Sequence, residues 1–270
     1  FRADGRLVAR KLVAYSNQGG YASHGHAIVA NAANEFKQLY QDEKATKADA
    51  YTVYSNIASG GAMRGYGIPQ AVFAIESHIE DLAFLIKMDP IEFRLKNCMR
   101  KGYKDPVTGI TAYSDGLVDC LIKGKEAVHW DEKRALYENQ RGPIRRGIGC
   151  AIFNYKTGVY PISLETASAR MVLNQDGSIQ LQMGATEIGQ GADTVFSQMA
   201  AEALGIPIEK VHICSTQDTD ISPFDTGAYA SRQTYVSGKA IVKTAQSLKE
   251  KILEYASDLL CKGMAGEEGK

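Results

Sequence analysis

The chain has 270 residues, enough for one large domain or two smaller ones, and its 44% hydrophobic and 23% charged content is ordinary for a globular protein. Lysine plus arginine balance aspartate plus glutamate at 31 each, so net charge favours neither nucleic acid nor an acidic membrane surface as a partner. The sequence has no apolar run of membrane-spanning length and no signal peptide, so no membrane association is expected.

The five cysteines lie far apart, without the close spacing of a zinc knuckle or an iron–sulfur cluster. Their odd number and apolar neighbours predict reduced thiols and a cytoplasmic location. The chain begins at Phe1 in the middle of a pattern, as expected of a fragment or a cleaved subunit.

The first hundred residues predict one strand followed by helices. Residues 7–15 are strand-like and lead into a glycine turn, whereas residues 27–40 have a helical pattern. A clearer helix opens at Pro69, because proline suits the first helical position and one face of the following turns is apolar, at Val72, Ile75, Ile79, Leu82 and Ile86. Asp89-Pro90 ends this helix, and a short helix is predicted over 91–99.

The rest of the chain predicts a connection and a second lobe. Residues 101–145 are rich in glycine, proline and charged residues, with one helix predicted at 117–129. Apolar residues alternate on both sides of Asp176-Gly177, which predicts a hairpin. A glycine loop, a helix at 192–204 and a strand at 211–215 then complete a predicted βαβ unit, and a long amphipathic helix is predicted at 237–260.

The predicted fold class is therefore α/β (α+β), with mixed sheets and packed helices. The predicted domains are residues 1–105 and 146–270, joined by a connecting segment at 106–145. No internal repeat or low-complexity segment is visible.

The glycine loop, Gly184-Ala-Thr-Glu-Ile-Gly-Gln-Gly191, is the most informative stretch. Glycines allow the backbone to approach a ligand, and the helix that follows adds partial positive charge at its N-terminus. This combination predicts a cradle for a phosphate or another anion. The spacing matches neither the phosphate loop nor the dinucleotide fingerprint, so neither standard nucleotide mode is expected.

A second candidate is Gly60-Gly-Ala-Met-Arg-Gly-Tyr-Gly-Ile-Pro-Gln70. A tight turn explains the glycines equally well. However, an arginine among glycines has little packing to justify it, and amides beside a guanidinium are typical of an oxyanion or phosphate site. The ring of Tyr66 could face a planar substrate.

A third candidate is Thr226-Gly-Ala-Tyr-Ala-Ser-Arg-Gln-Thr234, preceded by Ser215-Thr-Gln-Asp-Thr-Asp220. Small and hydroxyl residues before a helix suggest donors around an anion, although helix capping is the more ordinary explanation. His24 and His26 flank Gly25 without a third ligand and are a weak metal signal, and His78 is expected on a solvated face.

Taken together, residues 63–70, 184–191 and 228–234 strongly resemble, in this order, three cofactor segments of the molybdenum hydroxylases, the xanthine dehydrogenase and aldehyde oxidase superfamily. The intervening residues resemble the molybdenum-binding subunit of bacterial multi-subunit xanthine dehydrogenases. The chain is identified as a member of this superfamily, and its fold is expected to comprise parts of two molybdopterin-binding lobes.

The resemblance implies which residues bind the cofactor. In the family, molybdopterin holds molybdenum through a dithiolene, so no residue of this chain is expected to bind the metal directly. The implied cofactor residues border the molybdenum or contact the pterin. Among them, Gln190 is expected to donate a hydrogen bond. The full set is Arg64, Gly189, Gln190, Gly191, Ala230 and Ser231.

The resemblance also implies the substrate contacts. Tyr66 takes the place of an aromatic residue that stacks on the substrate ring. Asn31 aligns with an arginine that orients substrate in the purine enzymes of animals, which leaves purine specificity open.

The family reaction inserts oxygen derived from water at an electron-poor ring or aldehyde carbon, with a glutamate as the base. The family's Gly-Glu base motif and its upstream Gly-Gly-x-Phe-Gly segment have no counterpart in the sequence. No catalytic residue is therefore expected in this chain, which is predicted to be the middle of a molybdenum subunit and inactive alone. Iron–sulfur clusters and FAD are expected on partner subunits of a hetero-oligomer.

The predicted function is the molybdopterin-binding portion of a xanthine dehydrogenase-like oxidoreductase of purine metabolism, with or without a cytosine dinucleotide extension on the pterin. One alternative is an aldehyde, nicotinate or aromatic-CoA oxidoreductase of the same superfamily. Another is a non-catalytic pterin-binding or assembly module, and a third interpretation treats the glycine loops as mere turns.

Overall fold

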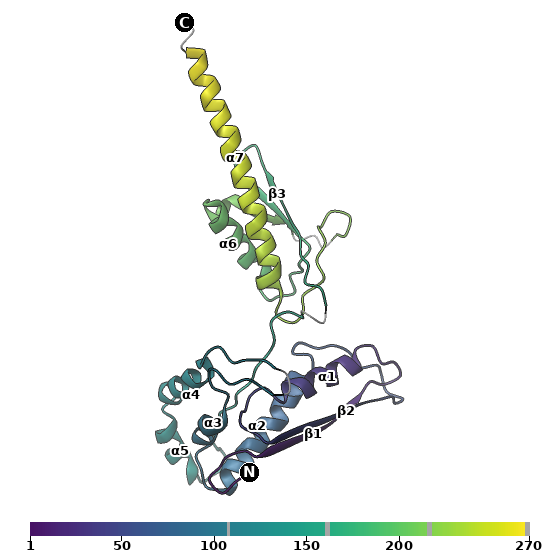
Figure 1. The fold of residues 1–270 in the computed structure, drawn as a ribbon, viewed down its shortest axis with the longest axis vertical. Helices are drawn as coiled ribbons and strands as arrows, with labels where there is room; N and C mark the ends of the chain where they lie inside the picture. Colours follow the sequence, from purple (N-terminus) through teal and green to yellow (C-terminus); the bar gives the residue numbers. More distant parts are fainter. Residues whose placement is uncertain (107–108, 160–162, 215–217, 268–270) are drawn as a thin grey trace. The chain divides into compact units, whose positions relative to one another are not determined.

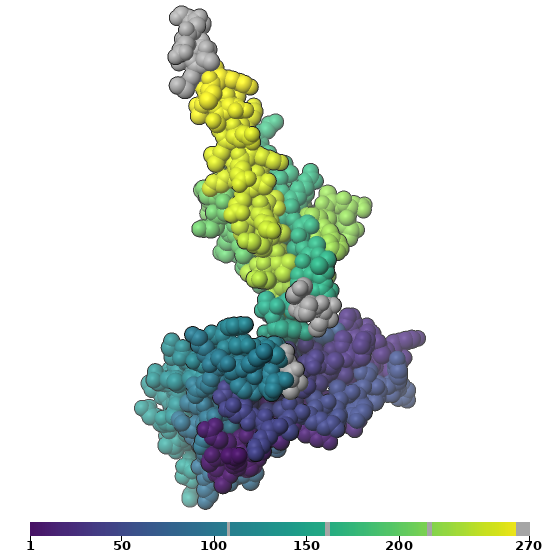
Figure 2. All heavy atoms as spheres, in the orientation of Figure 1, coloured from purple at the N-terminus to yellow at the C-terminus, as the bar shows by residue number. Residues whose placement is uncertain are grey.

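The computed structural model describes residues 1–106, 109–159, 163–214 and 218–267. By their contacts these residues form two compact units, Phe1–Tyr155 and Lys156–Lys270, which we call the N-terminal and the C-terminal unit and describe separately. Figure 1 shows the elements of each unit, and Figure 2 shows their atoms coloured along the sequence. None of the described helices combines the length and the apolar character that a membrane crossing requires.

The N-terminal unit contains a two-stranded parallel sheet. β1 (Ala9–Asn17) pairs with β2 (Ala45–Val53), and α1 (Gly25–Glu35) connects the two strands. Parallel strands need such a crossover, so these three elements form a βαβ unit. The strand and the helix predicted from the first forty residues are confirmed, although the helix ends at Glu35, before the predicted limit.

The second strand of this sheet was not predicted. Lys47 and Asp49 interrupt the apolar pattern of β2, and their side chains pair with each other instead, with Nζ 3.2 Å from Oδ2. The face that carries Tyr15 and Tyr51 is held by a stacked ring pair with centroids 5.1 Å apart. The register of the strands places these two residues directly opposite each other.

Four more helices follow in this unit (Figure 1): α2 (Ile68–Leu85) packs against α1, and α3 (Pro90–Asn97), α4 (Gly116–Ala127) and α5 (Trp130–Glu138) each pack against the helix before them. The helix predicted to open at Pro69 is confirmed as α2, with Ile75 and Ile79 buried. α3 begins where predicted because the Asp89 carboxylate accepts hydrogen bonds from the first amides of the helix, at 2.9 and 3.2 Å.

The segment predicted as a connection packs onto the N-terminal unit. Val118 and Leu121 of α4 and Trp130 of α5 belong to the same buried apolar cluster as α2 and α3. The helix predicted at 117–129 is confirmed as α4, whereas α5 was not predicted. Because Ile152 also belongs to this cluster, the contacts divide the chain after Tyr155 and not at the predicted limit of 146.

A buried ion pair joins α2 to α3. The Arg94 side chain is 0% exposed, and its Nε lies 2.8 Å from Oε2 of Glu76. Glu76 also accepts hydrogen bonds from the Tyr40 hydroxyl at 2.6 Å and from the Ile152 N–H at 2.9 Å. Burial and the Glu76 carboxylate raise the pKa of Tyr40 well above its ordinary value. One carboxylate therefore fixes three neighbouring segments.

The C-terminal unit contains a three-stranded mixed sheet. β4 (Ile179–Met183) lies at the centre, antiparallel to β3 (Ala169–Leu173) and parallel to β5 (Val211–Cys214). α6 (Ala192–Leu204) connects β4 to β5, which confirms the predicted hairpin and βαβ unit. Ser215, the last residue of the predicted strand, lies outside the described residues, as do Thr216 and Gln217.

The core of this unit lies between the sheet and two helices. Leu181 of β4 packs against Phe196 of α6 and Ile241 of α7 (Gly238–Glu267), all three of them buried. α7 confirms the long helix predicted at 237–260, and the π-helical turn η2 (Gln233–Ser237) leads into it. A short 3-10 turn, η1 (Ile208–Lys210), precedes β5.

Replacing Glu76 by alanine should lower the free energy of unfolding of the N-terminal unit by about 3–5 kcal/mol, because Arg94 would stay buried without its main partner. Chemical denaturation followed by tryptophan fluorescence measures this change, since Trp130 is the single tryptophan of the chain and lies in this core. The control is Glu92→Ala, which removes a half-exposed partner of Lys125 and should cost less than about 1 kcal/mol. Equal losses in the two variants would contradict the role of the buried pair.

Candidate functional site

The predicted site residues fall into two groups, one in each unit. Asn31, Arg64 and Tyr66 lie in the N-terminal unit, and those at 189–191 and 230–231 lie in the C-terminal unit. A hydrogen bond joins Asn31 to Tyr66 in the first group, and in the second a bond joins Gln190 to Gln233, in the same predicted segment as Ala230 and Ser231. Each group is described by itself.

The loop before α2 has an unusual backbone conformation. Gly65, Tyr66 and Gly67 have consecutive positive φ angles of 96°, 49° and 91°. Glycine adopts such angles readily, whereas the left-handed conformation costs another residue about 1–2 kcal/mol. A Cβ atom at Gly67 would also lie 2.6 Å from the carbonyl oxygen of Ile28. Strain of this kind is concentrated at ligand-binding sites, which favours a functional loop over a simple turn.

Asn31 of α1 supports this loop from the protein interior. Its side chain is 5% exposed, and its Nδ2 donates a hydrogen bond to the carbonyl oxygen of Tyr66 at 2.9 Å. Among the described residues, its Oδ1 has no hydrogen-bond partner. Asn31 therefore holds the strained residue in place, and its predicted contact with substrate stays a prediction.

The ring of Tyr66 is oriented by His24. The Tyr66 hydroxyl lies 2.8 Å from Nδ1 of His24, and the two rings meet edge to face with centroids 5.9 Å apart. In the sequence, His24 and His26 flank Gly25 as a weak metal signal. The part of the chain that the structure describes contains no group of three His, Cys, Asp or Glu side chains that could hold a metal ion. The role that the structure supports for His24 is its contact with Tyr66, which orients the tyrosine ring.

Arg64 lies two residues before Tyr66 and is exposed. Within the described ranges, its guanidinium makes no hydrogen bond or ion pair with another residue. This cation is therefore available to an anionic ligand, and its predicted role in binding the cofactor stays a prediction.

In the C-terminal unit, Gln190 joins two of the predicted segments. Its Nε2 donates to the carbonyl oxygen of Thr186 at 2.9 Å and to Oε1 of Gln233 at 2.7 Å. Its Oε1 accepts a hydrogen bond from the Ile188 N–H at 2.6 Å. Gln233 in turn donates to Thr186 at 3.1 Å, so the glycine loop and the 226–234 segment are held together at this point.

The anion bound by the glycine loop is the chain's own Glu187. Its carboxylate accepts hydrogen bonds from the N–H groups of Gly189, Gly191 and Asp193, at 2.6, 3.2 and 3.1 Å. The bond from Asp193 is the largest cause that lowers the pKa of Glu187, with the glycine amides adding to it against the opposing effect of burial. The prediction that these amides bind an external anion is thus corrected, because the Glu187 carboxylate of the same chain already accepts their hydrogen bonds.

Gly184, at the start of the loop, allows close approach to another segment. A Cβ atom there would lie 2.1 Å from the carbonyl oxygen of Pro223 and 2.7 Å from the amide nitrogen of Asp225. The backbone leaves no space for any side chain at this position. The glycine therefore fixes how the loop lies against the chain before the third segment.

Arg232 organises the third segment and is 0% exposed. Its Nε lies 2.6 Å from Oε2 of Glu165, and its Nη1 contacts Oδ1 of Asp225. It also donates to the carbonyl oxygens of Thr166 and Gly227, at 2.6 and 2.8 Å. Burial lowers the pKa of Arg232, but the hydrogen bonds and charges of Glu165 and Asp225 outweigh burial and raise the pKa above its ordinary value.

Ala230 and Ser231 have left-handed backbones beside this cluster, with φ angles of 48° and 52°. The Ala230 carbonyl accepts a hydrogen bond from the Gly158 N–H at 2.7 Å. No described residue accepts a hydrogen bond from the N–H of Ala230 or Ser231. Successive N–H groups in a turn can form an anion-binding concavity, so this turn, and not the start of α6, offers open donors.

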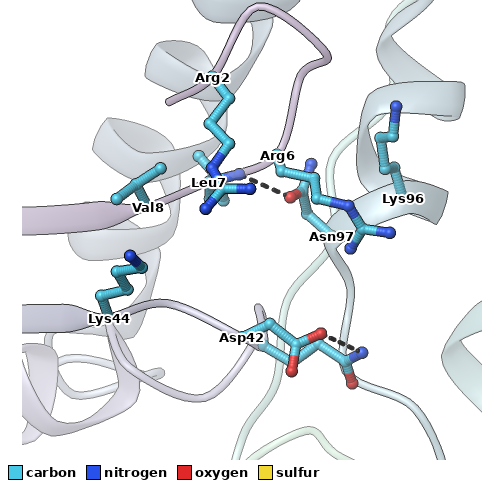
Figure 3. A pocket seen from close by; sticks show the side chains of 9 residues that line it. Arg2, Arg6, Leu7, Val8, Asp42, Lys44, Lys96 and Asn97 are labelled. Atoms are coloured by element: carbon cyan, nitrogen blue, oxygen red, sulfur yellow. Dashed lines mark hydrogen bonds between the residues drawn. The ribbon is translucent and has the colours of Figure 1, made fainter.

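A cavity of about 210 Å³ lies elsewhere in the N-terminal unit, and Figure 3 shows its lining. Four cationic side chains line this cavity, namely Arg2, Arg6, Lys44 and Lys96. The side chain of Asn97, which also lines it, accepts a hydrogen bond from the Leu7 N–H at 2.8 Å. None of the predicted site residues lines this cavity. It lies near the C-terminal end of α2, since Gly5 packs on Ile86 and Met88, whereas the Arg64 loop precedes the N-terminal end.

Two family models match the chain, at residues 1–98 and 123–267, and both describe a molybdopterin cofactor-binding domain. Among curated relatives, the xanthine dehydrogenase molybdenum-binding subunit of Escherichia coli O157:H7 is 49% identical over 257 residues. The match covers 95% of this chain and 34% of the relative, so the chain spans about a third of that relative's length.

Two solved structures are also similar to the chain. The aldehyde oxidoreductase from Desulfovibrio desulfuricans ATCC 27774 superposes with a TM-score of 0.79 at 29% identity, over 91% of this chain and 27% of that one. The CO dehydrogenase from Oligotropha carboxidovorans superposes with a TM-score of 0.75 at 25% identity, over 96% of this chain and 34% of that one.

Replacing Ser231 by glycine should raise the free energy of unfolding by up to about 1 kcal/mol, because glycine adopts the left-handed conformation without strain. The matched control is Ser247→Gly in α7, at an exposed helical position, where glycine should instead lower the free energy by about 0.5 kcal/mol. Denaturant unfolding of both variants measures the difference. A loss of stability at both positions would contradict the strained turn.

Proposed function

The chain belongs to the molybdopterin cofactor-binding domain family of the molybdenum hydroxylases, and we propose that its loops hold molybdopterin in a xanthine dehydrogenase-like hydroxylase. The observation that carries this proposal is the left-handed Ala230–Ser231 turn, whose N–H groups have no acceptor among the described residues. The turn lies in the segment that also contacts Gln190 through Gln233.

The residues present fit an anionic pterin cofactor. Each unit offers a partner suited to an anionic group: unpaired backbone donors at 230–231 in the C-terminal unit, and the exposed guanidinium of Arg64 in the N-terminal unit. The metal would be held through the pterin. When bound, the cofactor supplies a molybdenum centre for transfer of oxygen derived from water to an electron-poor carbon.

The residues of this chain would bind the cofactor and orient the substrate. Gln190 would present its side-chain amide from a position fixed by Thr186 and Gln233. Tyr66, held by Asn31 and His24, would offer its ring to a planar heterocycle of the purine type. Ala230 and Ser231 would donate backbone hydrogen bonds to the pterin. Together with Arg64 in the N-terminal unit and Gly189 and Gly191 in the C-terminal unit, these are the residues that we propose as binding residues, each unit taken by itself.

The proposal extends to the assembly. We propose that the active form is a hetero-oligomer with an iron–sulfur subunit and an FAD-binding subunit, and that the pterin is present with or without a cytosine dinucleotide. The similar relative is named as a molybdenum-binding subunit, which supports further subunits. The catalytic base is not among the residues that we assign to this chain.

An aldehyde oxidoreductase is the second candidate function. The structural likeness to the Desulfovibrio enzyme favours it, and so does Asn31. An amide that donates to the backbone of Tyr66 supplies no cation for a purine substrate.

Replacing Gln190 by alanine in the complete enzyme should lower kcat/KM by about 10–100-fold, because its loss removes a positioning contact. The melting temperature should fall by no more than about 4 °C, because the side chain and its hydrogen bonds are exposed in a loop. The control is Gln198→Ala, at an exposed position of α6, which should leave both unchanged. Molybdenum analysis and pterin fluorescence after oxidation test the proposal itself. An intact complex with neither metal nor pterin would refute it.

Replacing Tyr66 by alanine should raise the KM for xanthine by about fivefold, since stacking contributes about 1 kcal/mol. Tyr66→Phe keeps the ring and should raise this KM less. Steady-state kinetics with xanthine and an aliphatic aldehyde measure both variants. If the alanine variant changes the KM of the two substrates equally, or if xanthine is not oxidised at all, the result supports the aldehyde oxidoreductase function instead.

A further inference from the structure

Glu187 occupies the start of α6 with both of its carboxylate oxygens. Oε1 accepts hydrogen bonds from the Gly189 and Gly191 N–H groups, at 2.6 and 3.2 Å, and Oε2 accepts one from the Asp193 N–H at 3.1 Å. These amides belong to the loop and to the first turn of the helix. The carboxylate therefore links the loop to the helix that follows it.

The need for this carboxylate follows from the helix itself. The first amides of a helix have no partner within the helix, and the N-cap side chain commonly supplies one. Here the N-cap is Gly191, with a φ angle of 85° and no side chain to offer. A negative charge at this end also interacts favourably with the helix dipole. Glu187, four residues earlier, takes both roles.

The same carboxylate holds the backbone on both sides of Gln190. Gly189 and Gly191 have φ angles of 93° and 85°, and glycines are the residues that lose most conformational freedom when they are ordered. Bonds to one oxygen from both of these amides fix the peptide group between Ile188 and Gly189 and the one between Gln190 and Gly191. The side chain of Gln190 then reaches Thr186 and Gln233 from a defined position.

We propose that Glu187 is a positioning residue, an internal carboxylate that shapes the Gly189-Gln190-Gly191 loop before a ligand arrives. This inference rests on the proposed function for the role of Gln190 toward the cofactor. The role of Glu187 in shaping the loop does not depend on the cofactor. The experiment can therefore separate the two.

The test uses the full multi-subunit protein with Glu187→Ala, Glu187→Gln and the control Glu202→Gln, which lies at an exposed position of α6. The first measurement is amide hydrogen exchange in cofactor-free protein. In Glu187→Ala, exchange at Gly189, Gly191 and Asp193 should accelerate by at least about tenfold. In Glu187→Gln, which keeps one acceptor oxygen, it should accelerate at fewer of these amides.

Sodium acetate supplies the missing carboxylate as a probe. It should slow the accelerated exchange of Glu187→Ala, whereas sodium chloride at the same ionic strength should not. Exchange like that of the unmodified protein in Glu187→Ala would overturn the proposal. If Glu187→Ala fails to fold, Glu187→Gln decides, since unchanged exchange at all of these amides overturns the proposal and faster exchange supports it.

The second measurement separates positioning from simple capping. In cofactor-loaded protein, the EPR spectrum of substrate-reduced molybdenum should change in Glu187→Ala and return toward the unmodified spectrum in Glu187→Gln. A spectrum unchanged in Glu187→Ala, with only a lower melting temperature, would reduce Glu187 to a helix cap and overturn the proposal. A protein without molybdenum would refute the proposed function, while the exchange result would still decide the role of Glu187 in the loop.

Discussion

A guanidinium buried at 0% exposure cannot remain without partners, and this constraint at Arg232 organises the candidate site of the C-terminal unit. Glu165 and Asp225 provide the charge, and two backbone carbonyls complete the hydrogen bonds. Asp225 also accepts a hydrogen bond from Ser237 and lies against Gly184. Through these contacts one cation fixes the left-handed turn beside it, the entry to α7 and the start of the glycine loop.

The N-terminal unit also contains a buried arginine that is neutralised by a carboxylate. Arg94 and Glu76 form a buried pair in its core, and a strained loop precedes the helix that Glu76 belongs to. In both units the candidate loop ends in a left-handed glycine N-cap, Gly67 for α2 and Gly191 for α6. A buried charge pair provides the rigid base in each case, and the loop before the helix carries the residues that can reach a ligand.

The elements that the sequence predicted are those whose periodicity is set by burial, such as α2 and α6. β2 was missed because its polar residues pair with one another, and α5 because only Trp130 marks its buried side. The candidate loops were found through their glycines. The roles of Glu187 and Arg232 were not, because a side chain that bonds to nearby amides or carbonyls leaves no periodic trace. His24 and Tyr66, which are 42 residues apart, meet only in three dimensions.

The self-supplied carboxylate of Glu187 has a consequence for affinity. A loop already ordered by its own chain contributes no ordering entropy to binding, so the ordering cost has been met during folding. A substitution that loosens this loop would weaken every ligand that uses it by the same factor, whatever the ligand's chemistry, because the protein must reach the competent conformation before any of them can bind.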